Sequence, residues 1–141
     1  MLKVIIDTNV LVSSLIQRTY PFLIVEFLIK SLTSSICISV NVLNEYNDVL
    51  SREKFMKYPL FILNAKDLLS DLEGKAEKFY PIVTLDILGD KSDNKFLELA
   101  ETCNADFLIT GNTKHFPMRE YKNTKIVSPK EFWQFMTSNL P

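Results

Sequence analysis

Four acidic side chains occupy positions from which a folded chain can present them to one divalent cation. Asp7 follows the apolar run of residues 2–6, Glu45 lies at the edge of an apolar helical face, and Asp90 and Asp93 begin a further helical segment. Carboxylate oxygens are the ligands that Mg²⁺ and Mn²⁺ prefer. The competing reading is structural, because each aspartate is a good helix cap and Glu45 can pair with a lysine. Taken one at a time, the acids fit both readings.

Two further polar groups, Thr110 and Asn112, follow the predicted fourth strand. In open parallel sheets, ligands bind beyond the carboxyl ends of the strands, near the point where the strand order reverses. If the strands that end before Asp7 and Thr110 are neighbours at that point, the side chains of Asp7 and Asn112 share one crevice. A metal ion there would lower the pKa of water and stabilise charge on phosphorus, as hydrolysis of a phosphodiester requires.

The elements that position these residues alternate between strand and helix along the chain. Apolar runs rich in β-branched residues predict strands, and the segments between them repeat their apolar residues at helical spacing. This α/β alternation is typical of a parallel sheet covered by helices on both faces. The predicted strands are residues 2–6, 35–40, 82–84, 107–110 and 125–127, and the predicted helices are 10–16, 20–32, 41–51, 64–79, 93–104 and one that opens at Ser128-Pro129.

The composition indicates one soluble domain over residues 1–141, with 47% hydrophobic and 23% charged residues. The most apolar run, residues 22–29, contains Glu26 and is far shorter than the ~20 residues of a membrane span. The N-terminus has no secretion-signal pattern. Cys37 and Cys103 lack metal-type spacing, so we expect buried free thiols in a reducing compartment, the cytoplasm.

The net charge of −1 gives no overall attraction to nucleic acid, but the positive charges are unevenly placed. Between residues 112 and 130 the only acid is Glu120. Such a run is either a solvated rim or a basic lip beside the acidic site, and Lys91 and Lys95 lie near the acids in sequence. A lone histidine in such a loop, here His115, is more often a surface group than a ligand. The basic residues of the run are Lys114, Arg119, Lys122, Lys125 and Lys130.

Four blocks of sequence, taken together, resemble the PIN-domain family. They are residues 4–10 (VIIDTNV), 42–45 (VLNE), 90–97 and 105–112 (ADFLITGN), in the order and spacing of that family. The resemblance runs from about residue 2 to residue 130 and looks closest to the compact single-domain PIN proteins often found as toxins of toxin–antitoxin pairs. It implies a three-layer α/β/α fold with a five-stranded parallel sheet, and endonucleolytic cleavage of RNA that depends on Mg²⁺ or Mn²⁺.

The resemblance also assigns roles to residues. Asp7, Glu45 and Asp93 match the family's metal-binding acids, and Asp90 is the second choice within its block. We expect Thr110 and Asn112 to position the attacking water or the phosphate, and Asn9, Lys95 and Lys114 to contact the substrate. Asn112 is a departure, because many members of the family have an acid there. An amide can coordinate through its oxygen but supplies no charge, so metal affinity would be weaker.

Three other functions compete with an RNA-cleaving enzyme. A catalytically weak or inactive PIN domain would act as an RNA- or protein-binding module, and would bind RNA equally well in Mg²⁺ or in a chelator. A receiver-type phosphoacceptor would need paired acids near its start, where residues 2–9 offer only Asp7. A nuclease for structured DNA would favour an arch or clamp insertion, and the sequence has none.

The segment of residues 20–32 is apolar on nearly every side, which requires burial or a partner. We therefore predict that the protein forms a homodimer or binds an antitoxin peptide through this helix. The aromatic residues at 58–61 favour core packing over stacking on a base.

Overall fold

Six strands form one sheet in the computed structural model, which describes residues 1–138. They are β1 (Leu2–Ile6), β2 (Ser34–Ile38), β3 (Glu77–Lys78), β4 (Phe107–Ile109), β5 (Glu120–Tyr121) and β6 (Thr124–Val127). Their order is β3-β2-β1-β4-β6-β5, and every neighbouring pair is parallel except β5 with β6. The α/β fold with a mostly parallel sheet is confirmed, with six strands in place of five.

The strand order reverses between β1 and β4. From β1 the chain builds β2 and β3 on one side, then crosses to β4 and β6 on the other. The register pairs Ile6 with Ile109, and the N–H of Asp7 donates to the carbonyl of Ile109 at 2.8 Å. The two strands are therefore neighbours, which is the condition under which Asp7 and Asn112 share one crevice, and the residues that follow each strand emerge at one place.

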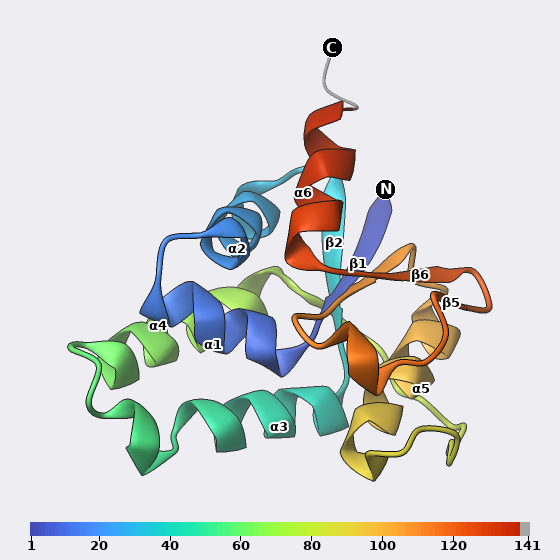
Figure 1. The fold of residues 1–141 in the computed structure, drawn as a ribbon, viewed down its shortest axis with the longest axis horizontal. Coiled ribbons are helices and arrows are strands. Elements are labelled where there is room, and N and C mark those ends of the chain that lie inside the picture. The colour runs from blue at the N-terminus through green and yellow to red at the C-terminus, as the bar shows by residue number, and fades with distance from the viewer. Residues whose placement is uncertain (139–141) are drawn as a thin grey trace.

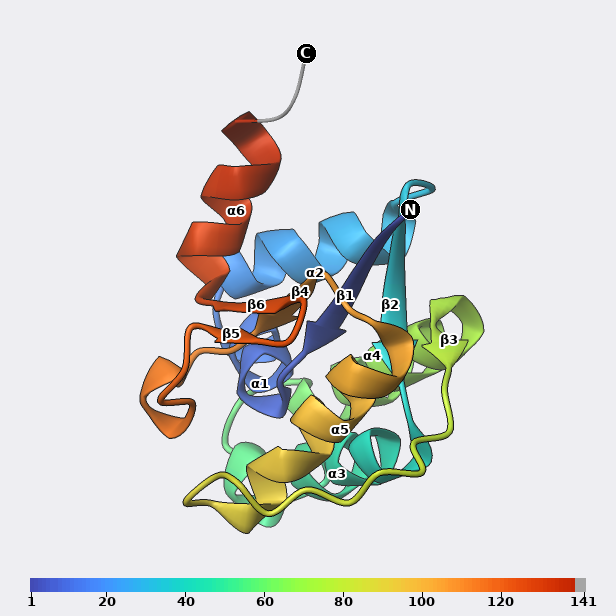
Figure 2. The ribbon, with the colours of Figure 1, turned by 90° about the vertical axis from the view of Figure 1, so that its right-hand side faces the viewer.

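Helices cover both faces of this sheet (Figures 1 and 2). Figure 2 shows α5 (Asn94–Cys103) on the near face, while α1 (Thr8–Ile16) and α2 (Tyr20–Lys30) lie on the far face. α6 (Pro129–Ser138) and α4 (Phe61–Lys75) pack against α2, and α3 (Val40–Leu50) lies beyond the strand ends, in contact with α1 and α5. Within residues 1–138 there are also three short 3-10 turns: η1 (Glu53–Phe55), η2 (Lys91–Asp93) and η3 (Thr113–His115).

The predicted third strand at residues 82–84 is wrong. Ile82 is 99% exposed, and Glu77–Lys78, directly after α4, takes the free edge of β2. The following chain pairs its backbone with side chains of α5, because the N–H groups of Ile87 and Leu88 donate to Oδ1 of Asn94. Three β-branched residues therefore do not make a strand where no neighbouring strand offers hydrogen bonds.

The sequence also gave no indication of β5, which pairs antiparallel with β6. Residues 122–123 connect the two strands, and Lys122 adopts a φ of 52°. A turn with this backbone conformation usually contains Gly or Asn-Gly. Because a lysine occupies it here, the sequence did not predict the hairpin. The last helix is confirmed, since Ser128 and Glu131 form reciprocal side-chain to backbone hydrogen bonds of 3.0 and 3.1 Å.

The helix boundaries differ from the predicted ones by at most four residues, and the largest differences are at the two ends of α4. α1 begins at Thr8 because Asp7 caps it, and α4 begins at Phe61, directly after Leu60 in a left-handed conformation. Phe61 is buried and stacks on Phe55 at 4.7 Å, as core packing of this aromatic segment predicts. Cys37 and Cys103 are both free and buried, also as predicted.

The apolar helix α2 is covered on much of its surface, but not on all of it. Ile24, Val25 and Leu28 are buried, whereas Leu23 is 42% exposed. Among the described residues no single helix has the length and hydropathy of a membrane span; α1 and α2 pass the same test only as a pair bent by 107°.

The buried hydroxyl of Tyr46 on α3 donates to the carbonyl of Ile6, the residue before Asp7. Tyr46→Phe leaves that carbonyl without its donor, so we expect a loss of about 1–3 kcal/mol in unfolding free energy. Urea denaturation measures it, with Tyr80→Phe as the exposed control, expected within about 0.5 kcal/mol of the native protein. Equal stability of the two variants would contradict a structural role for this contact.

Candidate functional site

Asp7 is the most enclosed acid of the site, with 5% of its surface exposed. It caps α1, because Oδ1 accepts from the N–H of Thr8 at 2.7 Å, while Oδ2 accepts from the hydroxyl of Thr110 at 2.8 Å. Burial, opposed by the Thr110 hydrogen bond and reinforced by the charges of Asp93 and Glu45, raises the pKa of Asp7 to about 6. The cap that the sequence offered as an alternative is thus present, and so is the predicted crowding of acids.

Asp93 and Asp90 approach from the turn before α5. Asp93 is buried, and its Oδ2 lies 3.0 Å from Nδ1 of His115. Burial and the neighbouring charge of Asp90 raise the pKa of Asp93. Asp90 is exposed, and hydrogen bonds from Ser92 hold its Oδ1 and lower its pKa. Potential ligand atoms of Asp90, Asp93 and His115 all lie within 4.8 Å of one another.

Glu45 faces the same cavity from α3 but is already neutralised. Its Oε1 accepts from the ammonium of Lys95 at 2.9 Å, and its Oε2 accepts from the hydroxyl of Thr8. The glutamate and lysine side chains are only 15% and 25% exposed, so solvent screens this pair less than a surface ion pair. The lysine partner foreseen as the structural alternative is therefore present.

Asn9, Thr110 and Asn112 link the two strand ends. Oδ1 of Asn9 accepts from the N–H of Gly111 at 2.9 Å, and a Cβ at Gly111 would lie only 3.2 Å from that oxygen. The N–H of Asn112 donates to the hydroxyl of Thr110 at 3.0 Å, and Thr110 in turn donates to Asp7. These residues therefore position Asp7 and the loop after β4.

One open cavity of about 510 Å³ joins these groups. Its polar and charged lining comes from the ends of β1 and β4, from α3 and from the turn before α5. Thr110 is fully buried beneath it. The lining includes Asp7, Asn9, Glu45, Asp90, Asp93, Asn112 and His115, with Val12, Val49 and Phe55.

The basic groups that reach this cavity are not those of the predicted basic run. Arg52 and Lys54, which follow α3, line the cavity. Lys95 lines an adjoining hollow with Arg52 and Glu45, whereas Lys114 and Arg119 line a separate hollow beside Phe116 and Met118. Arg52 and Lys54 lie within ten residues of Glu45 in sequence, and this proximity was the available signal.

His115 is the other site residue that the sequence did not single out as a ligand. It is brought to Asp93 by η3, three residues after Asn112, and its Nε2 lies 2.9 Å from Nδ2 of Asn112. Its position in the first turn after the strand-end loop was the signal that this lone histidine faces the site.

The donor set fits a divalent cation. Three aspartates and one histidine supply oxygen and nitrogen ligands at one cavity. A bound cation would relieve the repulsion among Asp7, Asp93 and Glu45. Ligand atoms of Asp90, Asp93 and His115 lie within 4.8 Å of one another, and Asp7 and Glu45 line the same cavity.

Comparison with known proteins identifies the family and the fold. A family model described as the PIN domain matches residues 3–114. A solved structure of VapBC2 from Rickettsia felis, bound to a DNA fragment from their promoter, is similar with a TM-score of 0.60 and 20% sequence identity. The match covers 90% of this chain and 98% of that one. No curated protein matches the sequence.

The raised pKa of Asp7 predicts a pH-dependent cost in the metal-free protein. The folded state holds a proton on Asp7 up to about pH 6, and the unfolded state only to about 3.8, so stability falls as pH rises through this window. Above it, ionised Asp7 costs the fold up to about 3 kcal/mol. In chelator, Asp7→Asn should therefore be more stable than the native protein at about pH 7.5 and equal to it near pH 4. Denaturation at both pH values measures this, and lower stability of the variant at pH 7.5 would contradict it.

Proposed function

The chain belongs to the PIN-domain family, and on that premise we propose that it is a metal-dependent endoribonuclease, the toxin of a toxin–antitoxin pair. The observation that carries the proposal is the convergence of buried Asp7 with Asp93 and Asp90 at the carboxyl ends of β1 and β4. Two free cysteines suit the reducing cytoplasm, where we place its action.

We assign the metal to Asp7, Asp93 and Asp90, with Glu45 in reach of the same cavity. Mg²⁺ or Mn²⁺ bound there would supply an activated water and Lewis-acid stabilisation of the charge on phosphorus. Glu45 differs from the three aspartates because Lys95 and Thr8 hold both of its oxygens. Its role is to orient Lys95 and Thr8 at the rim, and direct ligation would require Lys95 to move away.

Thr110 acts through Asp7, and the backbone of Asn112 acts through Thr110. The Thr110 hydroxyl fixes the direction of the Asp7 carboxylate, and the Asn112 N–H fixes that hydroxyl. The side chain of Asn112 faces the cavity and is available to donate to a phosphate oxygen or accept from water. We therefore give Thr110 a positioning role and Asn112 a role in placing the phosphate or the water.

The RNA backbone approaches from the side of Arg52 and Lys54. These cations line the acidic cavity, and Arg52 and Lys95 line the adjoining hollow, where they pair with Asp48 and Glu45. Phosphates that flank the cleaved bond gain from cations, whereas the cluster of acids repels them. Asn9 lines the same cavity. An open cavity of this kind suits a single strand or a loop, whose backbone is exposed.

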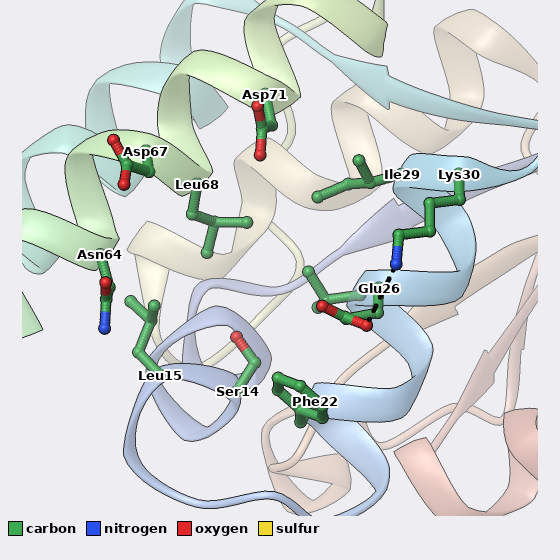
Figure 3. Close-up of a pocket in the computed structure, with 11 residues that line it drawn as sticks. Ser14, Leu15, Phe22, Glu26, Ile29, Lys30, Asn64, Asp67, Leu68 and Asp71 are labelled. Atoms are coloured by element: carbon green, nitrogen blue, oxygen red, sulfur yellow. Dashed lines mark hydrogen bonds and ion pairs between the residues drawn. The ribbon is translucent and has the colours of Figure 1, made fainter.

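An antitoxin peptide would occupy the groove between α1, α2 and α4 (Figure 3). The floor is apolar, with Leu15, Phe22, Ile29 and Leu68, and its volume is about 220 Å³. Figure 3 shows Asp67 and Asp71 along the α4 side of the groove, opposite Glu26 of α2, which pairs with Lys30 at 3.5 Å. This combination fits an amphipathic segment that carries apolar and basic side chains.

The outer face of α2 is the surface that we assign to a homodimer. Leu23, 42% exposed, lies in a shallow apolar hollow with Phe27, and Phe27 meets Trp133 of α6 edge to face. A symmetric pairing through this face would bury the apolar surface that α2 leaves open.

A second function, an RNA- or protein-binding module without cleavage, is favoured by two observations. Asn112 occupies a position where many family members have an acid, and Lys95 neutralises Glu45. Both reduce the negative charge that is available to a metal. Binding without cleavage would then use Arg52 and Lys54 in the same way.

Cleavage of RNA distinguishes the two functions. We expect native protein with Mg²⁺ or Mn²⁺ to cut a single-stranded RNA, and Asp7→Asn or chelation to slow cutting by at least about 100-fold, as loss of a metal's charge stabilisation implies. Lys66→Gln, at an exposed position of α4 outside the cavity, is the matched control and should cut at the native rate. Equal RNA binding in Mg²⁺ and in chelator, with no cutting, would favour the binding module. Cutting that survives chelation would contradict the mechanism.

Light scattering tests both protein partners of α2. We expect the native chain alone to have twice its 16.3 kDa mass and to bind a synthetic helical peptide with leucines on one face and arginines beside them. The double substitution Asp67→Lys, Asp71→Lys reverses the charge of the groove that faces the peptide's arginines. It should weaken peptide binding about tenfold or more without changing the oligomeric mass of the protein. Unchanged peptide affinity would rule out the groove, and a monomeric mass would rule out the dimer.

A further inference from the structure

His115 is the only histidine of the sequence, and it stands in the cluster of potential metal ligands. Its ring lies 3.0 Å from Oδ2 of Asp93 through Nδ1, with Asp90 within 4.8 Å. Asp93 is buried, while the histidine side chain is 45% exposed and lines the cavity. An imidazole so placed is either a hydrogen-bond partner of Asp93 or a nitrogen ligand beside it.

The neighbouring amide of Asn112 decides which nitrogen of the ring carries the proton. In the hydrogen-bonded arrangement, Nδ2 of Asn112 donates to Nε2 of His115, so Nδ1 is protonated and donates to Asp93. If the amide turns over, Oδ1 replaces Nδ2 and accepts from a protonated Nε2. Nδ1 is then left with a free lone pair beside the Asp93 oxygen. A metal-bound histidine characteristically donates its second N–H to such an oxygen.

We propose that His115 is a metal ligand, held in the ligating tautomer by Asn112, and that it gives the site a preference for Mn²⁺ over Mg²⁺. The inference rests on the proposed metal site and assigns it a nitrogen ligand. Mg²⁺ is a hard cation that selects oxygen, whereas first-row transition ions accept imidazole.

This assignment accounts for Asn112. An acid at that position would add charge to an oxygen-only site, while the amide supplies no charge but offers both a donor and an acceptor to Nε2. Ser92 holds Asp90 through Oδ1, and η3 carries His115 to the same point. The chain thus replaces one carboxylate at the strand end with an imidazole three residues later.

Because the chain has one imidazole, electron spin-echo spectroscopy of bound Mn²⁺ gives a direct readout, provided that the protein carries no histidine tag. We expect ¹⁴N modulation from a directly bound nitrogen in native protein and in Lys114→Gln, and none in His115→Gln. By calorimetry, His115→Gln should weaken Mn²⁺ binding about tenfold or more, the scale set by loss of a supporting group at metal sites, and Mg²⁺ binding less than about threefold.

Asn112 is tested as a positioning residue with the same spectrum. Asn112→Leu removes the acceptor for Nε2–H and should abolish the ¹⁴N modulation, while Asn112→Asp keeps an acceptor and should retain it. Retention of the modulation in Asn112→Leu would overturn the positioning role.

The outcomes separate this inference from the proposed nuclease. Mn²⁺ binding with ¹⁴N modulation but without RNA cutting would uphold the histidine ligand and reject the activity. Metal-dependent cutting without ¹⁴N modulation, or equal loss of Mg²⁺ and Mn²⁺ affinity in His115→Gln, would overturn the histidine ligand and leave the nuclease standing.

Discussion

Asp7 is enclosed by protein and lies near two other acids, so its ionisation is costly. The arrangement of the site follows from how that cost is offset. Burial and the charges of Asp93 and Glu45 make ionisation unfavourable, so its pKa rises to about 6. Thr110 and the first N–H of α1 offset part of this cost. A proton or a cation must offset the rest. A side chain placed there for capping alone would need no second and third acid close by.

The strand order brings the acids of the site together. β1 and β4 are neighbours at the point where the strand order reverses, so Asp7 and the loop from Thr110 to Asn112 emerge together. Glu45 lies on α3, beyond the strand ends. The hydroxyl of Tyr46, one residue later, donates to the carbonyl of Ile6 and so holds that helix against β1. Asn94 anchors the chain before α5, which leaves Asp93, and not Asn94, at the cavity. The same contacts that stabilise the fold therefore fix the acids.

Much of this could be predicted from the sequence, because buried strands and helical faces follow from local patterns. The α/β class and the buried face of α3 depended on such patterns, whereas the adjacency of β1 and β4 was only a condition that the structure meets. The strand at 82–84 failed because pairing depends on a free edge, and β2 offered its edge to residues 77–78 instead. The placement of His115 and of Arg52 depended on how the loops after β4 and α3 fold back, which no periodicity encodes. The position of Lys114, which lines a separate hollow, depends on the same loop.

The match to the PIN family covers residues 3–114, which include every acid of the cavity, and an amide and a histidine follow the Thr-Gly pair after β4. The account therefore depends on a divalent ion at the junction of Asp7, Asp90 and Asp93. Anomalous diffraction from crystals soaked in Mn²⁺ is the most direct measurement. The account predicts a manganese peak in the cavity, within bonding distance of Asp93 and at least one of the other two aspartates. Full diffraction with no such peak, or a peak only at distant surface acids, would contradict it.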